Sequence, residues 1–183
     1  MIVEIGHFAV VLALIVALVQ SVLPAWGAQT RDARLMSVAE PAALVQLGLL
    51  IIAFLALTHA YVTSDFSVET VWANSHSLKP MLYKVSGVWG NHEGSMLLWV
   101  LILALFGAAV AAFGHNLPQS LRANVLAVQA VIAVAFLLFI VVASNPFIRI
   151  PVQGEGRGLN PILQDPGLAF HPPFLYAGYV GLS

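Results

Sequence analysis

Four long apolar stretches dominate the pattern of hydrophobic and polar positions along this chain. A transmembrane helix needs about 20 consecutive, mostly apolar residues to cross the hydrocarbon core of a bilayer. Four stretches reach this length, and they predict membrane spans at about residues 5–25, 42–62, 95–114 and 123–143. A further apolar run, over residues 173–183, is about half as long as a span requires and predicts the start of a fifth.

This pattern predicts an all-α fold, a polytopic transmembrane helix bundle with four full spans and a truncated fifth. We expect a single transmembrane domain over residues 1–183. Two of the predicted loops are short, at about residues 26–41 and 115–122. The other two are long, at about residues 63–94 and 144–172.

Composition supports a membrane location and excludes several classes of protein. The chain has 183 residues, of which 60% are hydrophobic and 8% are charged. Soluble domains average about 25% charged residues, so a soluble enzyme, a disordered segment and a nucleic-acid binder are all disfavoured. The chain has no cysteine, which excludes disulfides, thiolate metal sites and covalent attachment of c-type haem to this chain. Lipid is the expected environment.

The first apolar stretch predicts a retained helix rather than a cleaved signal peptide. The six residues before its core carry only Glu4 as a charge, and the apolar core is longer than that of a typical signal sequence. The short loops carry three basic residues, Arg31, Arg34 and Arg122, and the long loops carry four. Because long loops cross the membrane with little regard to charge, the density of basic residues in the short loops favours a cytoplasmic location for them. We therefore expect the N-terminus and both long loops on the outer face, which is the periplasm if the membrane is a bacterial inner membrane.

This topology would place five of the six histidines at one membrane face. They are His7, His59, His76, His92 and His171, whereas His115 would lie at the opposite face. Neutral imidazole is a common ligand of metals and haem iron, and it titrates near physiological pH. The grouping is consistent with a ligand or proton site. A simpler interpretation is that membrane interfaces and long loops tolerate polar residues.

The first long loop ends in a run of polar and glycine residues that could shape a site. Trp89, Asn91, His92 and Glu93 lie immediately before the third predicted span. The zinc-protease pattern fails here, because Met96 stands where a second histidine would be required. The alternative is structural: these residues would start the helix, with the carboxylate of Glu93 near its positive end.

The second long loop contains two features of interest. A glycine-rich run over residues 154–158 lacks the Lys-Ser/Thr that phosphate-binding loops carry, so it predicts a flexible turn. Further along, Pro161, Pro166, Pro172 and Pro173 predict a stiff loop, which would hold His171 at the mouth of the fifth helix. A rigidly held histidine is suited to be a ligand, although Pro172 and Pro173 would also mark an ordinary helix start.

Several of these runs resemble the CcmF family, the haem-lyase subunit of the bacterial cytochrome c maturation system. The strongest likenesses are YKVSGVWGNHEGS over residues 83–95 and LQDPGLAFHPPFLY over residues 163–176. EIGHFA over residues 4–9 and YVTSDFS over residues 61–67 are also similar. The resemblance implies a multi-pass inner-membrane protein that accepts haem b from the chaperone CcmE. It also implies covalent attachment of this haem to apocytochrome c in the periplasm, together with CcmH and CcmI.

By this resemblance, His171 matches the first of two periplasmic histidines thought to bind the iron of the haem being transferred. The tryptophan-rich segment, the second periplasmic histidine and the two membrane histidines that hold a resident b-type haem have no match among these 183 residues. We therefore expect the chain to correspond to the N-terminal portion of the family architecture, and to be incomplete as a lyase without the remaining C-terminal part.

Two other functions stay open on the sequence alone. A transporter or ion-pathway subunit could use His59, Glu93 and Gln129 as a polar route. The centres of the predicted spans hold no Asp, Glu, Lys or Arg, and Gln46 and Gln129 are better interpreted as interhelical hydrogen-bond partners. A third possibility is a scaffold that docks maturation partners through its two long loops.

Overall fold

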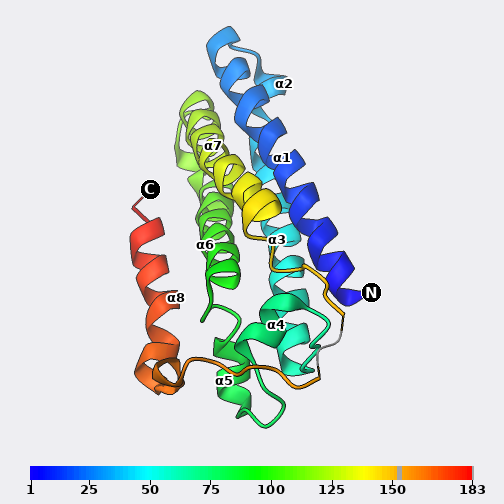
Figure 1. Cartoon of the computed structure of the whole chain (residues 1–183). Coiled ribbons are helices and arrows are strands. Elements are labelled where there is room, and N and C mark those ends of the chain that lie inside the picture. Colours follow the sequence, from blue (N-terminus) through cyan, green and yellow to red (C-terminus); the bar gives the residue numbers. More distant parts are fainter. Residues whose placement is uncertain (152–153, 183) are drawn as a thin grey trace.

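Four long helices pack side by side to form the body of the molecule in the computed structural model, which describes residues 1–151 and 154–182 (Figure 1). Each is long and apolar enough to cross a membrane. They are α1 (Ile2–Thr30), α3 (Ala39–Val62), α6 (His92–Phe113) and α7 (Gln119–Ala143). A fifth helix, α8 (Pro166–Val180), stands beside α6. The predicted all-α bundle with four candidate membrane-spanning helices is confirmed.

Short helices connect these long ones. Within the described residues the structure has no β-strand, and one isolated antiparallel bridge joins Val68 to Arg149. The connecting helices are α2 (Ala33–Met36), α4 (Glu69–Asn74), α5 (Met81–Ser86), and the 3₁₀ turns η1 (Gly114–Asn116) and η2 (Pro161–Gln164).

Small side chains let the four helices approach closely. On α1 the buried positions recur every three or four residues and include Gly6, Ala9, Ala13 and Ala17. Helix α7 repeats the pattern, and its buried residues include Ala123, Ala127, Ala130 and Ala133. Small residues at this spacing bring backbones together, and packing of this kind holds membrane helices to one another. Helix α1 accordingly packs against both α3 and α7, and α6 packs against α3 and α7.

The helix boundaries differ from the predicted spans in an informative way. Helix α1 continues beyond residue 25 and ends where Arg31 adopts a left-handed conformation with φ of 58°. Helix α6 begins at His92 because the side chain of Asn91 caps it. His92 and Glu93, which were expected in the loop, therefore belong to the first turn of α6.

The start of the fifth helix was predicted wrongly. It begins at Pro166 rather than at residue 173, because the carboxylate of Asp165 accepts a hydrogen bond from the Leu168 amide and Pro166 suits the first helical turn. Pro172 and Pro173 consequently lie inside the helix. His171 is therefore a residue of α8 and not part of a stiff loop. Ser183, the last residue of the predicted fifth span, lies outside the described residues.

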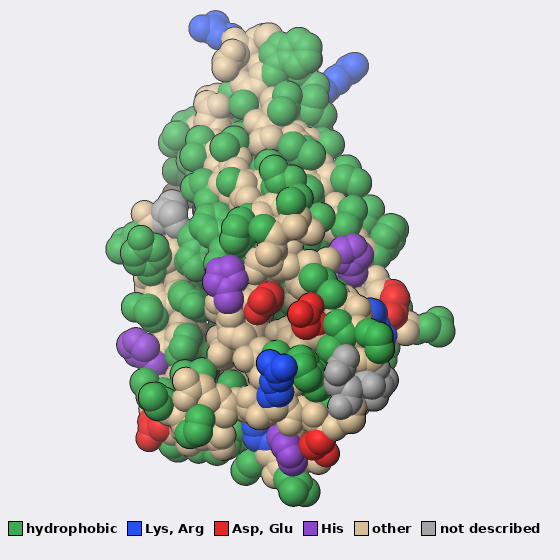
Figure 2. All heavy atoms as spheres, in the orientation of Figure 1, with side chains coloured by type: hydrophobic (Ala, Val, Ile, Leu, Met, Phe, Trp, Pro, Cys, Tyr) green, Lys and Arg blue, Asp and Glu red, His purple; other side chains and the backbone are tan. Residues whose placement is uncertain are grey.

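Both long connections lie at the same end of the bundle as the N-terminus, and the short connections lie at the other end (Figure 1). We call the first the loop end; it comprises residues 63–91, the described part of 144–165 and the adjoining ends of the five long helices. On the face drawn in Figure 2, hydrophobic side chains cover most of the length, whereas acidic and histidine side chains gather towards the loop end. At the opposite end Arg122 forms an ion pair with Glu40.

Glutamines supply polar groups within the bundle. Gln20 of α1 donates a hydrogen bond of 3.2 Å to the Leu126 carbonyl of α7 and so joins these two helices. The prediction for Gln46 and Gln129 is not confirmed: among the described residues, Gln46 Nε2 and Gln129 Oε1 are buried without a hydrogen-bond partner. Gln129 points towards α6, where the absence of a side chain at Gly107 accommodates it.

Candidate functional site

Asn91 organises the junction between the loop end and α6. Its Oδ1 accepts a hydrogen bond of 2.8 Å from the Gly94 amide and caps the helix. Its Nδ2 donates to the Tyr61 hydroxyl of α3 at 2.9 Å and to the Gly87 carbonyl at 2.8 Å. The Thr70 hydroxyl of α4 also donates to Asn91 Oδ1. One amide therefore fixes α3, α4 and the chain before α6 relative to one another.

Trp89 connects this junction to α8. Its indole nitrogen donates a hydrogen bond of 2.8 Å to the Ala169 carbonyl. Its ring stacks on Phe54 of α3, with ring centroids 6.5 Å apart and an angle of 13° between the planes. Trp89 thus contacts the body of the bundle with its ring and the histidine-bearing helix with its N–H.

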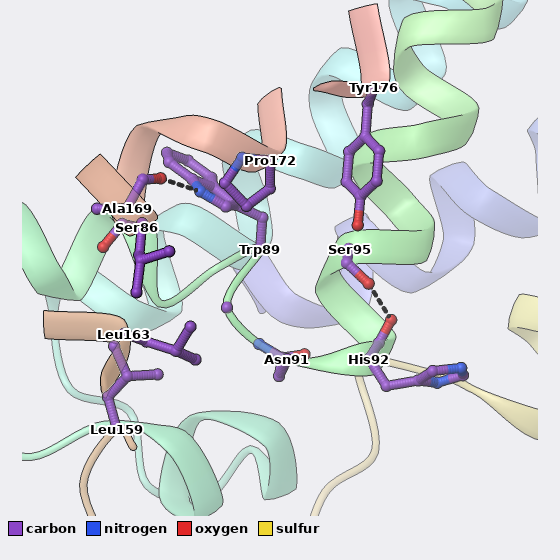
Figure 3. Close-up of a pocket in the computed structure, with 12 residues that line it drawn as sticks. Ser86, Trp89, Asn91, His92, Ser95, Leu159, Leu163, Ala169, Pro172 and Tyr176 are labelled. Carbon is purple, nitrogen blue, oxygen red and sulfur yellow. Dashed lines mark hydrogen bonds between the residues drawn. The ribbon is translucent and has the colours of Figure 1, made fainter. Parts of the chain in front are cut away.

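A pocket of about 290 Å³ opens between α6, α8 and the two long connections (Figure 3). This volume is at the lower end for small-molecule sites. The Ser86 hydroxyl is buried there without a hydrogen-bond partner among the described residues. The lining consists of Ser86, Trp89, Gly90, Asn91, His92, Ser95, Leu159, Leu163, Leu168, Ala169, Pro172 and Tyr176. Three predicted site-shaping residues, Trp89, Asn91 and His92, are brought together around it.

His92 and Glu93 face different surroundings. The imidazole of His92 points away from Trp89 (Figure 3), and its Nδ1 shares a hydrogen bond of 2.9 Å with the Ser144 hydroxyl after α7. Glu93 does not line this pocket. It lies in a separate small cavity with Glu69 of α4 and Asn145. Among the described residues, no hydrogen bond joins the His92 imidazole to the Glu93 carboxylate.

His171 is exposed in the second turn of α8, outside the lining of the pocket. Among the described residues, no hydrogen bond or ion pair is found for its side chain. Phe174 and Leu175 follow it at the spacings that share one helix face, and they are 76% and 51% exposed. The imidazole thus stands on an exposed apolar helix face, next to the pocket residues Ala169 and Pro172.

The histidines at the loop end do not gather into one cluster. His7 shares a hydrogen bond with Asn145, and His76 Nδ1 accepts one from the Leu78 amide. His59 lies exposed in the last turn of α3. Throughout the described part of the chain, no group of three or more His, Cys, Asp or Glu side chains is placed to hold a metal ion. A multi-histidine metal centre built by this chain is therefore not supported.

The glycine-rich run is fixed rather than flexible. The amides of Arg157 and Gly158 donate to the carbonyls of Trp72 and Ser75, and the Arg157 guanidinium lies 4.1 Å from the centre of the Trp72 ring. Gly156 packs so tightly on Ser75 that a Cβ atom would lie 2.1 Å from its carbonyl oxygen. The prediction of a flexible turn is therefore wrong: Gly154 and Gly158 adopt left-handed backbone conformations with φ of 85° and 91°, and Gly156 allows the two long connections to pack closely.

Glu155 and Arg149 provide further links that the sequence analysis missed. The amide and hydroxyl of Ser77 donate to Glu155, and these bonds hold the pKa of Glu155 below its ordinary value. Arg149 pairs with Glu4 at 2.7 Å and with Asp65 at 2.9 Å. Burial acts against ionisation of Asp65, but hydrogen bonds from Ser67 and Arg149 outweigh it and lower the pKa of Asp65. The only sign of these ion pairs in the sequence is that it carries opposite charges at Arg149, Glu4 and Asp65, which lie far apart along the chain.

Comparisons with known proteins agree with this architecture. The chain is 68% identical over 184 residues to the cytochrome c-type biogenesis protein ccl1 of Rhodobacter capsulatus. It is 52% identical over 185 residues to the cytochrome c-type biogenesis protein CcmF of Pseudomonas aeruginosa. Each comparison covers 100% of this chain and 28% of the relative. The chain therefore spans about 28% of the length of these relatives.

A solved structure described as the cytochrome c haem lyase CcmF superposes with a TM-score of 0.84 and 26% identity. The superposition covers 100% of this chain and 28% of the chain in the solved structure. Residues 89–183, just over half of the sequence, match the family described as cytochrome c assembly protein. This segment contains α6, α8 and every residue that lines the pocket except Ser86. The chain thus belongs to the cytochrome c assembly protein family and is similar over its whole length to CcmF proteins.

Proposed function

We propose that this chain acts in cytochrome c biogenesis as part of a haem lyase, with His171 as an axial ligand of the haem being transferred. The observation that carries this proposal is the placement of His171, exposed on an apolar face of α8 at the loop end. Imidazole is a common axial ligand of haem iron, and exposed Phe174 and Leu175 offer apolar surface to a porphyrin. Membership of the cytochrome c assembly family supports haem as the group handled.

Haem b is the substrate in this proposal rather than a resident cofactor. Each thioether bond forms when the S–H of a substrate cysteine adds across a haem vinyl group, so the thiol hydrogen ends on carbon and no oxidant is needed. The lyase contributes mainly position, by holding the vinyl groups where the thiols can reach them. The absence of cysteine from this chain is compatible with such a role, because the reacting thiols belong to the apocytochrome.

The proposed setting is a bacterial inner membrane with the loop end in the periplasm. Arg31, Arg34 and Arg122 at the opposite end favour this orientation by the positive-inside rule. The proposed partners are the haem chaperone CcmE, the subunits CcmH and CcmI, apocytochrome c, and the polypeptide that makes up the remaining length of the relatives. A resident b-type haem is expected only with that remaining polypeptide.

A transporter or ion pathway is less well supported by the arrangement of polar groups. His59 lies at the end of α3, Glu93 lies in the first turn of α6, and Gln129 lies on α7. Gln129 Oε1 is buried against Gly107 and has no hydrogen-bond partner among the residues that the structure describes. The three residues therefore do not describe a continuous polar route through the bundle.

The proposal is tested by the haem content of the purified protein. The chain is co-expressed with the polypeptide that supplies the relatives' remaining length and with haem-loaded CcmE, and the absorption spectrum is compared for wild type and His171→Ala. We expect the haem content of the variant to be at least ten-fold lower than that of wild type, or its absorption spectrum to be shifted, while membrane insertion stays unchanged. His59→Ala is the matched control, because His59 is also exposed at the loop end.

Unchanged haem content and spectra in His171→Ala would overturn the ligand role. That outcome would leave the chain as a scaffold for maturation partners, which is the second candidate function. Loss of haem in both His171→Ala and the His59→Ala control would also count against a specific ligand role for His171.

A further inference from the structure

Two consecutive prolines inside α8 leave carbonyl groups without their usual donors. In an α-helix each carbonyl accepts a hydrogen bond from the amide four residues later, and proline has no amide hydrogen. Pro172 and Pro173 both lie inside α8. Pro173 therefore removes the helical donor of the Ala169 carbonyl, and Pro172 removes that of the Leu168 carbonyl. These carbonyls belong to the two turns that carry His171.

Trp89 supplies one of the missing donors from outside the helix. Its indole N–H donates to the Ala169 carbonyl at 2.8 Å, which is a well-formed hydrogen bond. Ala169 is 4% exposed, so without Trp89 its carbonyl would have little access to water. Removing the donor of a buried carbonyl destabilises a protein more than removing the donor of a solvated one, because water cannot replace the lost hydrogen bond.

The ring of Trp89 is itself fixed. It stacks on Phe54 of α3 and precedes Asn91, whose amide ties the same segment to Tyr61. The donor is therefore anchored to the body of the bundle, while the acceptor belongs to α8. Because His171 lies two residues after Ala169, the bond restrains the turn of helix from which the imidazole projects.

We propose that Trp89 is a positioning residue, which clamps the proline-interrupted turn of α8 and thereby sets the location of His171. Trp89 acts through α8 and does not touch the haem in this scheme. The prolines are part of this arrangement, because they remove the helical amide donor of the Ala169 carbonyl and leave it dependent on a hydrogen-bond donor outside α8. The effect of Trp89 on haem binding rests on the proposed function of His171. The restraint of α8 by the Trp89–Ala169 hydrogen bond does not depend on that function.

The test measures the position of α8 directly. The chain has no cysteine of its own, so spin labels can be attached at Val22→Cys on α1 and Tyr179→Cys on α8, both of which are exposed. Distances between the labels are recorded by double electron–electron resonance in nanodiscs, with the remaining polypeptide of the relatives present and its cysteines replaced. We expect Trp89→Phe, which keeps an aromatic ring but loses the N–H, to broaden or shift the distribution.

A pair of proline variants identifies the hydrogen bond as the cause. Pro173→Ala restores an amide to the Ala169 carbonyl, so Trp89→Phe should have little further effect in that background. Pro172→Ala restores a donor to Leu168 instead, and there Trp89→Phe should act as strongly as in wild type. We call α8 docked when it lies in the position that the structure shows, and undocked when it is displaced from it. We expect the ratio of docked to undocked α8 to fall about three- to ten-fold in Trp89→Phe alone, as the loss of one net hydrogen bond implies.

Trp99→Phe is the matched control, because Trp99 stacks on Phe136 of α7 and does not contact Ala169. An unchanged distribution in Trp89→Phe, or an equal change in the Pro173→Ala background, would overturn the clamp. Haem recovery is measured in the same samples and should fall with the docked fraction. A displaced α8 with undiminished haem would overturn the positioning role, whereas failure of the His171 test alone would overturn only the proposed function.

Discussion

The membrane-spanning bundle and the loop end are held together by different means. In the bundle, small and apolar residues such as Ala13, Ala17 and Ala130 pack at almost zero exposure over the length of the helices. At the loop end, single polar groups join distant segments, as Asn91 joins α3 to α6 and Arg149 joins α1 to the chain after α3. The bundle depends on many equivalent contacts, whereas the loop end depends on a few specific ones.

This difference has consequences for function. A packed helix interface tolerates substitutions that keep the side-chain volume, since its stability is spread over many contacts. A loop held by individual hydrogen bonds can be displaced by one substitution, and the histidine-bearing start of α8 belongs to that kind of structure. Substitutions at the loop end should therefore separate assembly of the site from insertion of the helices.

The largest effect is expected at Gly94, where the two regions meet. A Cβ atom there would lie 1.6 Å from the Val88 carbonyl oxygen, because the chain before α6 folds back across the first turn of the helix. Gly94→Ala must therefore displace residues 88–91 or the helix start, at an expected cost of about 3 kcal/mol or more. Thermal unfolding in detergent, followed by circular dichroism, measures this loss.

Gly48→Ala provides the comparison within the bundle. Gly48 lies in α3, and an added Cβ atom there would meet nothing within 4 Å. Alanine favours helix by about 1 kcal/mol over glycine, so this variant should match or exceed wild type in stability. Equal stability of Gly94→Ala and Gly48→Ala would contradict the close packing at the junction.

A smaller effect is expected at Asn91, and two variants divide its roles. Asn91→Asp keeps an acceptor for the Gly94 amide but loses the donor to Tyr61 and Gly87, whereas Asn91→Ala loses both. We expect a loss of about 2 kcal/mol for Asn91→Ala and an intermediate loss for Asn91→Asp. Cleavage by trypsin after Lys84 should accelerate in the same order, while the bundle helices stay protected. Unchanged cleavage in Asn91→Ala would show that the amide does not hold the loop end.

The sequence alone predicted the bundle well because lipid imposes a simple requirement of length and apolarity. The four spans followed from that requirement. The start of α8 was missed because Pro172 and Pro173 usually precede a helix, and only an outside donor such as Trp89 makes their interior position acceptable. Trp89, Asn91 and His92 were recognised as neighbours in sequence, but their separate partners depend on tertiary contacts that no local pattern contains.

The smallest expected effect, taken per pH unit, is a pH dependence that originates at Lys79. This lysine is 8% exposed, and its ammonium donates to the Asn74 carbonyl at the end of α4. Burial, and secondarily the charge of Lys84, lowers the pKa of Lys79 from 10.5 to about 8. Between pH 8 and pH 10.5 the unfolded chain binds more protons at this site than the folded chain does, so stability should rise with pH across that window.

Lys79→Met should abolish this rise, because it removes the titrating group and keeps a long side chain. The slope is limited to about 1.4 kcal/mol per pH unit for one proton, and the other titrating groups are shared with wild type. Lys84→Met should narrow the window by removing the charge that lowers the pKa of Lys79. Unfolding temperatures of the three proteins are compared from pH 7 to pH 10.5. Parallel curves for wild type and Lys79→Met would show that the Lys79 ammonium is solvated, and that the loop end at this point resembles an open loop more than a packed one.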